Sequence, residues 1–140
     1  MTAPCREACC SATPRLTVSE LVERGFRRNR TAPLPVLGAE LSDAEGNTAR
    51  FSLAITDERI VDANFRVSSC ATLIAYCEFI AEFVPGARLD NVTALTAADL
   101  IEGLPGVPAL KRGRAVLAVA AFRAALAQTN ERQMQTEVAS

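Results

Sequence analysis

The chain has 140 residues, of which 49% are hydrophobic and 22% charged, as is typical of one folded domain with a core of its own. Its formal net charge of −1 provides no basic field for nucleic acid, and its longest apolar run, Ala115 to Phe122, is too short to cross a membrane. It contains no histidine, which removes the usual general base and every Ser-His-Asp or Cys-His arrangement, so we do not expect an enzyme.

Residues 1–14 are small, polar and without periodicity, and we predict that they form a flexible tail. The tail contains Cys5, Cys9 and Cys10, whose spacing matches no known zinc or cluster motif. These thiols are either incidental or able to fold back and complete a metal site. Because the start of the chain lacks the apolar segment of a secretory signal, we expect a cytoplasmic protein with reduced cysteines.

A helix is predicted to begin at Thr17 or Ser19, since both residue types cap helices, and to end before the two prolines of residues 31–35. Its expected apolar stripe consists of Leu21, Val22 and Phe26. Four arginines lie in its second half, and they form either a solvated helix face or a local docking patch: Arg24, Arg27, Arg28 and Arg30.

The period then changes to two residues, which predicts strands at Val36 to Leu41, Phe51 to Ile55 and Ile60 to Ser68. Short turns separate these strands. Sequential strands joined by short turns form an antiparallel meander, so we expect a three-stranded antiparallel sheet.

Helical patterns follow Cys70. One predicted helix ends at Pro85-Gly86, a short one follows Thr96, and an alanine-rich one runs from about Leu110 to Gln128. The fold class is therefore α+β, with the helices packed on one face of the meander. We predict a single domain over residues 15–129 and a frayed polar C-terminal tail over residues 130–140.

Roughly half of the chain, from about Ile60 to Leu126, resembles the IscU/NifU N-terminal family of iron–sulfur cluster assembly scaffold proteins. The resemblance lies in three stretches that occur in the family's order: IVDANFRVSSCATLIAYCEFIAEFVPGARLDN, TAADLIEGLPGVPALK and AVLAVAAFRAAL. It implies an IscU/SufE-like fold and a role in iron–sulfur cluster assembly.

The family's site has three cysteines and one aspartate on separate loops. The resemblance places the middle cysteine at Cys70, the first near Glu45 and the third near Arg114, where Gly113 replaces a histidine that often precedes it. Asn47 stands where the family has its aspartate. One thiol of the three is thus kept, and this departure puts ordinary scaffold activity in question.

Cys70 lies where a strand ends and a helix begins, and helix N-terminal amides favour the thiolate. Such a thiolate ligates iron or accepts a persulfide sulfur, whereas the plain alternative is a small residue selected for packing. Cys77 lies roughly 10 Å further along the same helix, which is too far to share a metal, and is predicted to be a core residue. Glu45 is a conceivable extra ligand or a plain turn residue. Arg112 and Arg114 oppose a normal cluster but suit an anion or the thiolate.

The leading hypothesis is a divergent scaffold or carrier that binds iron or a labile cluster, such as a [2Fe-2S] cluster, through Cys70, with zinc as an alternative metal. A second subunit in a homodimer or the cysteine tail would complete the ligands. The alternatives are a single-cysteine persulfide acceptor like the SufE family, whose cysteine lies nearer Glu45, and a non-catalytic docking module.

The resemblance also implies partners. These are a cysteine desulfurase, client apoproteins and a chaperone, whose recognition loop in the family is only echoed by residues 104–108 and Lys111. Neither nucleic acid nor a membrane is expected as a partner.

Overall fold

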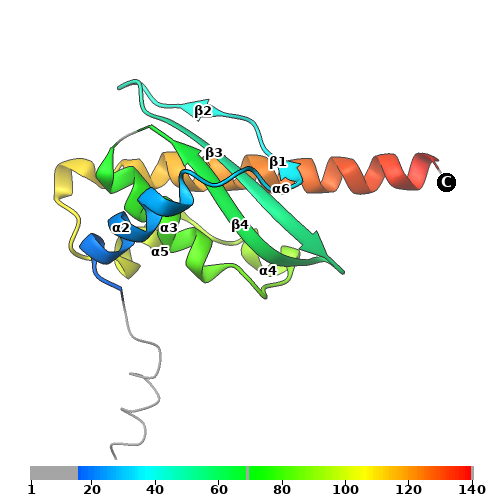
Figure 1. Cartoon of the computed structure of the whole chain (residues 1–140), viewed down its shortest axis with the longest axis horizontal. Coiled ribbons are helices and arrows are strands. Elements are labelled where there is room, and N and C mark those ends of the chain that lie inside the picture. The colour runs from blue at the N-terminus through cyan, green and yellow to red at the C-terminus, as the bar shows by residue number, and fades with distance from the viewer. Residues whose placement is uncertain (1–15, 69, 140) are drawn as a thin grey trace, which may run out of the picture.

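The computed structural model describes residues 16–68 and 70–139 (Figure 1). In chain order the elements are helix α2 (Val18–Arg28), strands β1 (Val36–Leu37), β2 (Leu41–Ser42), β3 (Thr48–Thr56) and β4 (Arg59–Val67), helices α3 (Ala71–Phe83), α4 (Leu89–Val92) and α5 (Ala97–Gly103), the 3-10 turn η1 (Ala109–Lys111), and helix α6 (Arg114–Ala139). The predicted α+β class is therefore confirmed, and no helix in this described part is long and apolar enough to span a membrane.

Strand β3 is the centre of an antiparallel sheet. It pairs with β4 along its whole length, from Ala49 opposite Val67 to Thr56 opposite Arg59, and with both β1 and β2 on its other side. The predicted meander is thus present, but its first strand is interrupted between β1 and β2. At the interruption Gly38 lies so close to helix α6 that a Cβ atom there would be 2.7 Å from the Ala125 backbone.

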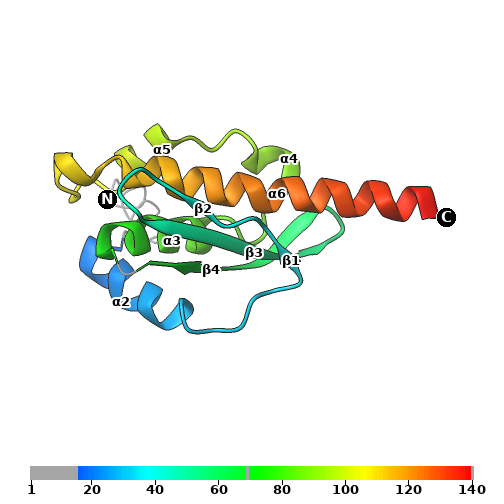
Figure 2. The ribbon, with the colours of Figure 1, turned by 90° about the horizontal axis from the view of Figure 1, so that it is seen from above.

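Helices α3 and α6 lie on the same side of the sheet, as Figures 1 and 2 show. The ring of Phe51 on β3 lies 5.7 Å from that of Phe65 on β4 and 5.6 Å from that of Phe122 on α6. These aromatic contacts join both layers at the centre of the core. Helix α6 extends past the strands to Ala139, whereas a frayed tail was expected there. No glycine or proline follows Gln128, so nothing in the local sequence stops the helix.

Helix α2 begins at the predicted cap. The Thr17 hydroxyl accepts a hydrogen bond from the Glu20 amide at 3.1 Å, and the Glu20 carboxylate accepts one from the Thr17 amide at 2.8 Å. The expected apolar stripe is only partly correct, because Phe26 is 45% exposed while Gly25 is buried against Ile74 of α3. The missing side chain at Gly25 lets the two helices approach closely and turns Phe26 outward.

Arg28 connects α2 to α3 and β4. Its Nε and Nη2 atoms donate to the two carboxylate oxygens of Glu78 at 2.7 and 3.2 Å, and its Nη1 atom donates to the Ala63 carbonyl at 2.7 Å. The Glu78 side chain is only 1% exposed, which is rare for a carboxylate unless it is paired. Burial and a hydrogen bond with Glu82 raise the pKa of Glu78 to about 7, against the lowering effect of Arg28.

The outer edge of β4 is closed by other parts of the chain. The side-chain amide of Asn29 accepts from the Val67 N–H at 2.9 Å and donates to the Val67 carbonyl at 3.2 Å. At the other end, the Ile60 N–H donates to the Ala87 carbonyl and the Ile60 carbonyl accepts from the Gly86 N–H. Backbone groups at both ends of this edge strand therefore have partners within the chain.

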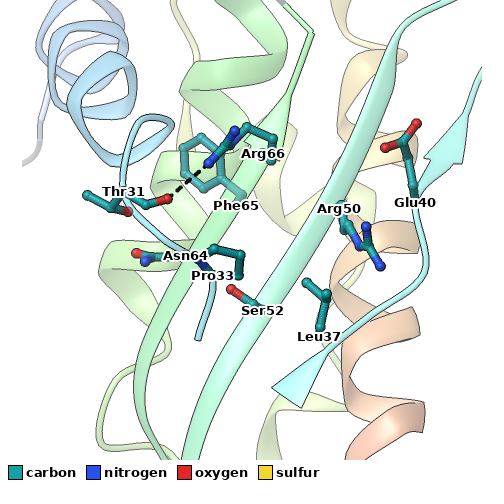
Figure 3. A pocket seen from close by; sticks show the side chains of 9 residues that line it. All are labelled: Thr31, Pro33, Leu37, Glu40, Arg50, Ser52, Asn64, Phe65 and Arg66. Carbon is teal, nitrogen blue, oxygen red and sulfur yellow. Dashed lines mark hydrogen bonds between the residues drawn. The ribbon is translucent and has the colours of Figure 1, made fainter. Parts of the chain in front are cut away.

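The segment from Thr31 to Pro35 crosses the sheet face opposite α3 and α6. The Leu34 amide donates to the Ser52 hydroxyl at 2.9 Å, and Arg66 donates to the Thr31 carbonyl at 3.1 Å. A cavity of about 180 Å³ remains between this segment and the strands, lined in part by Arg50 and Phe65 (Figure 3). It is separate from the residues that the sequence proposes as functional.

Candidate functional site

Cys70 occupies the junction between β4 and α3, as predicted. It is the N-cap residue of α3, with extended backbone angles (φ −79°, ψ 117°), and its carbonyl accepts the first helical hydrogen bond from the Ile74 amide at 3.0 Å. Its side chain is partly exposed. The sulfur therefore lies near the free amides of the first helical turn, in a residue that is only partly buried.

The surroundings of Cys70 favour its thiolate. Partial burial raises the pKa of the thiol, but the Leu73 and Thr72 amides and the Arg114 guanidinium together lower it by more, so the pKa lies below its usual value. In the structure Sγ makes no capping hydrogen bond to the helix, so the amides of the first turn are not consumed by a completed cap. A thiolate fraction above that of an ordinary cysteine follows at neutral pH.

Arg114, the first residue of α6, lies between Cys70 and the turn that contains Glu45. Its Nη2 atom forms an ion pair with the Glu45 carboxylate at 2.8 Å, and its side chain is only 14% exposed whereas that of Glu45 is 65% exposed. Contact with the Cys70 sulfur and the charge of Glu45 raise the pKa of Arg114. The Nε atom of Arg114 is buried and has no hydrogen-bond partner among residues 16–68 and 70–139. The structure thus brings together the three positions that the sequence aligned with the family's cysteines.

The turn that presents Glu45 is held by Asp43. One oxygen of the Asp43 carboxylate accepts from the Glu45 and Asn47 amides, both at 2.9 Å, and the other accepts from the Asn47 side chain at 3.0 Å. These bonds, with that to the Asn47 side chain foremost, lower the pKa of Asp43. Sequence reasoning did not single out Asp43, although an aspartate three residues before a glycine is a turn signal, and Gly46 has a φ of +88°.

The predicted metal ligands are only partly placed. Glu45 is an ion-pair partner in this structure, and Cys5, Cys9 and Cys10 lie outside the described residues. Among residues 16–68 and 70–139, no three His, Cys, Asp or Glu side chains form a group able to hold a metal ion. The described residues therefore offer Cys70 a neighbouring cation, Arg114, which is itself paired with Glu45, but no set of fellow ligands.

Cys77 differs sharply from Cys70. It is fully buried in the core, and burial raises the pKa of its thiol well above the usual value. The predicted assignment of Cys77 as a core residue is confirmed by this burial. Arg112 is exposed, and Arg114 is the arginine that lowers the pKa of Cys70. Of these two arginines, we therefore assign Arg114 to the site.

A comparison with known protein families shows to which family the chain belongs. The family described as "NifU-like N terminal domain" matches residues 23–136. The match covers most of the chain, and the protein therefore belongs to the NifU-like N-terminal domain family.

Individual relatives agree with that assignment. The chain is 32% identical over 83 residues to the iron–sulfur cluster assembly scaffold protein IscU of Escherichia coli (strain K12), which is 59% of this chain and 64% of that protein. It is also 26% identical over 113 residues to iron–sulfur cluster assembly protein 2 of Arabidopsis thaliana, which is 80% of this chain and 69% of that protein. The match thus spans slightly less than two thirds of the bacterial relative.

Among solved structures, the chain is similar to the N-terminal part of a nitrogen-fixing NifU-like protein from Brucella abortus. The TM-score is 0.45 at 24% identity, with 78% of this chain and 81% of the other covered.

Proposed function

We propose that this protein works in iron–sulfur cluster assembly as a scaffold-type protein without catalysis of its own, and that Cys70 is the residue that holds its cargo. The observation that supports this most directly is the partly exposed Cys70 thiol at the start of α3, whose pKa is lowered by neighbouring amides and by Arg114. Membership of the family supplies the process, since both relatives named above are iron–sulfur assembly proteins.

Sulfur is the cargo that this geometry suits best, because a single thiolate suffices for it. The Cys70 thiolate would attack the outer sulfur of a donor persulfide. The donor's S–S bond breaks, the donor leaves as a thiolate, and a new S–S bond forms on Cys70 without net oxidation or reduction. A lowered thiol pKa increases the population of the attacking form.

A carrier of iron or of a labile cluster, such as a [2Fe-2S] cluster, is the second candidate, and zinc is an alternative metal. Family membership favours it. With no three-ligand group among the described residues, this candidate needs further ligands, either Cys70 of a second copy in a homodimer, Glu45 after it releases Arg114, or the tail residues Cys5, Cys9 and Cys10.

The proposed partners follow from the same role. A cysteine desulfurase would supply the sulfur, client apoproteins would receive sulfur or cluster, and a chaperone would assist transfer. The cytoplasmic location expected from the sequence stays a prediction. A docking module that keeps the fold but needs no thiol is the outcome expected if Cys70 proves dispensable.

The experiment that tests the proposal is incubation of the full chain with a cysteine desulfurase and cysteine, followed by peptide mass mapping. We expect the mass of one sulfur atom on the Cys70 peptide in wild type and none in Cys70→Ser. A variant with Cys5, Cys9 and Cys10 replaced by serine is the matched control, because it removes three thiols but keeps Cys70.

Anaerobic reconstitution with iron and sulfide tests the second candidate. Charge-transfer absorption that is present in wild type and lost in Cys70→Ser would favour the cluster carrier. If wild type takes up neither sulfur nor iron, the thiol-based function is wrong and only the docking role stands.

A further inference from the structure

We propose that Arg114, held in place by Glu45, determines what Cys70 carries, by favouring an anionic sulfur species on the thiol and disfavouring a divalent metal ion there. The inference rests on the proposed function, because it concerns the cargo of the same cysteine. It makes Arg114 a specificity-determining residue and Glu45 a positioning residue.

The Arg114 guanidinium is held in a fixed position. Its Nη2 atom is ion-paired with the Glu45 carboxylate at 2.8 Å, and only 14% of the Arg114 side chain is exposed. Glu45 in turn follows Asp43, whose carboxylate accepts three hydrogen bonds from its own turn. The positive charge is therefore part of the site's structure rather than a mobile surface group.

Arg114 also has a hydrogen-bond donor that no described residue uses. The Nε atom of Arg114 is buried and lacks a partner in the described part of the chain, which is a costly arrangement for an N–H group. The terminal sulfur of a persulfide lies one S–S bond, about 2 Å, beyond Sγ and carries the negative charge when ionised. An anion that extends from Cys70 is the kind of acceptor that this donor lacks.

The charge of Arg114 would also act on a metal ion bound to Cys70. A metal–thiolate bond is about 2.3 Å long, so a metal ion on Cys70 would lie close to a guanidinium that already contacts the same sulfur. Arginine does not lose its proton in proteins, so the repulsion cannot be relieved by deprotonation. The same side chain thus stabilises an anionic cargo and destabilises a cationic one.

The test compares wild type with Arg114→Gln, Arg114→Lys and Glu45→Gln. Each protein is mixed with cysteine persulfide, and the rate of sulfur addition to Cys70 is followed by mass spectrometry across pH. Zinc affinity is measured separately with a competing chromophoric chelator, after removal of the tail thiols by serine substitution in every variant.

We expect Arg114→Gln to slow sulfur addition at neutral pH by about tenfold, as the loss of a hydrogen bond to a charged group does, to move the rate profile to higher pH, and to bind zinc more tightly than the parent. Arg114→Lys should restore most of the rate and the weak zinc binding, since it keeps the charge. Glu45→Gln should give a smaller change in the direction of Arg114→Gln.

Unchanged rates and unchanged zinc affinity in Arg114→Gln would overturn the inference, as would equal losses in Arg114→Gln and Arg114→Lys. Should Arg114→Gln not fold, the exposed Glu45→Gln change decides in its place, because it loosens the same guanidinium. The proposed function fails separately, when wild-type Cys70 takes no sulfur from any persulfide, and the zinc comparison still tests the inference in that case.

Discussion

Two arginine–carboxylate pairs in this protein differ in how completely the guanidinium is used. Arg28 donates from three nitrogens, to both oxygens of Glu78 and to the Ala63 carbonyl. Arg114 forms an ion pair with the exposed Glu45 through Nη2, and its buried Nε has no hydrogen-bond partner among the described residues. The first pair lies between helices, and all three of its guanidinium nitrogens already donate hydrogen bonds. The second lies beside a thiol and keeps a guanidinium donor that is not used by any described residue. A saturated pair contributes to structure, and an unsaturated one is available for chemistry.

The largest effect that separates the two pairs is expected from removal of their carboxylates. Glu78→Ala should lower the free energy of unfolding at pH 8 by about 2–3 kcal/mol, because the largely buried Arg28 loses its shortest ion pair and keeps only the longer ones to Asp62 and Glu82. Glu45→Ala should cost no more than about 1 kcal/mol, because the Glu45 carboxylate is exposed. Urea denaturation of both variants measures the difference, and similar costs for the two would contradict the distinction.

The glycines beside the two pairs offer a smaller effect. A Cβ atom at Gly25 would collide with the Ile74 side chain, so Gly25→Ala should destabilise the protein by about 1–2 kcal/mol despite the higher helix propensity of alanine. A Cβ atom at Gly113, next to Arg114, would meet nothing within 4 Å, so Gly113→Ala should stay within about 0.5 kcal/mol of wild type. Thermal unfolding compares the two, and equal midpoints would show that the helix interface tolerates the extra atom.

The third prediction concerns pH. The folded state holds the Glu78 proton up to about pH 7, whereas an ordinary glutamate releases it near 4.5, so the folded state binds more protons between these values. The free energy of unfolding should therefore fall as the pH rises from about 4.5 to 7, by at most about 1.4 kcal/mol per pH unit. Glu78→Gln should flatten this slope while Glu45→Gln should not. A stability that rises across the window in wild type, and equally in Glu78→Gln, would refute the shift.

Much of the fold was predictable from local patterns. Alternation at Phe51 to Ile55 and Ile60 to Ser68 located β3 and β4, and Thr17 marked the start of α2. The interruption of the first strand was not predictable in this way. It coincides with the close approach of α6 to Gly38, a contact between distant segments that has no local pattern. Helix α6 continues to Ala139, beyond the end near Gln128 that the sequence predicts, because no glycine or proline interrupts the segment.

The site was predictable only in part. A cysteine at a strand-to-helix junction identified Cys70, and the resemblance placed Glu45 and Arg114 at neighbouring positions. What the sequence left open was whether Glu45 would be a ligand, because an ion pair between residues 69 positions apart has no local signature. The burial of Glu78 was not predictable for a similar reason. A single carboxylate in a helical pattern indicates an exposed side chain unless its arginine partner on another helix is known.

The edges of the sheet have a consequence for behaviour at high concentration. A strand with free backbone groups is a template for a neighbouring molecule, and chains that expose one are prone to fibrillar aggregation or domain swapping. One edge here consists of two strands of only two residues each, and the other has its backbone groups occupied at Val67 by Asn29 and at Ile60 by Ala87 and Gly86. Neither edge offers a long uninterrupted template, so association of copies would have to use side-chain surfaces rather than continuation of the sheet.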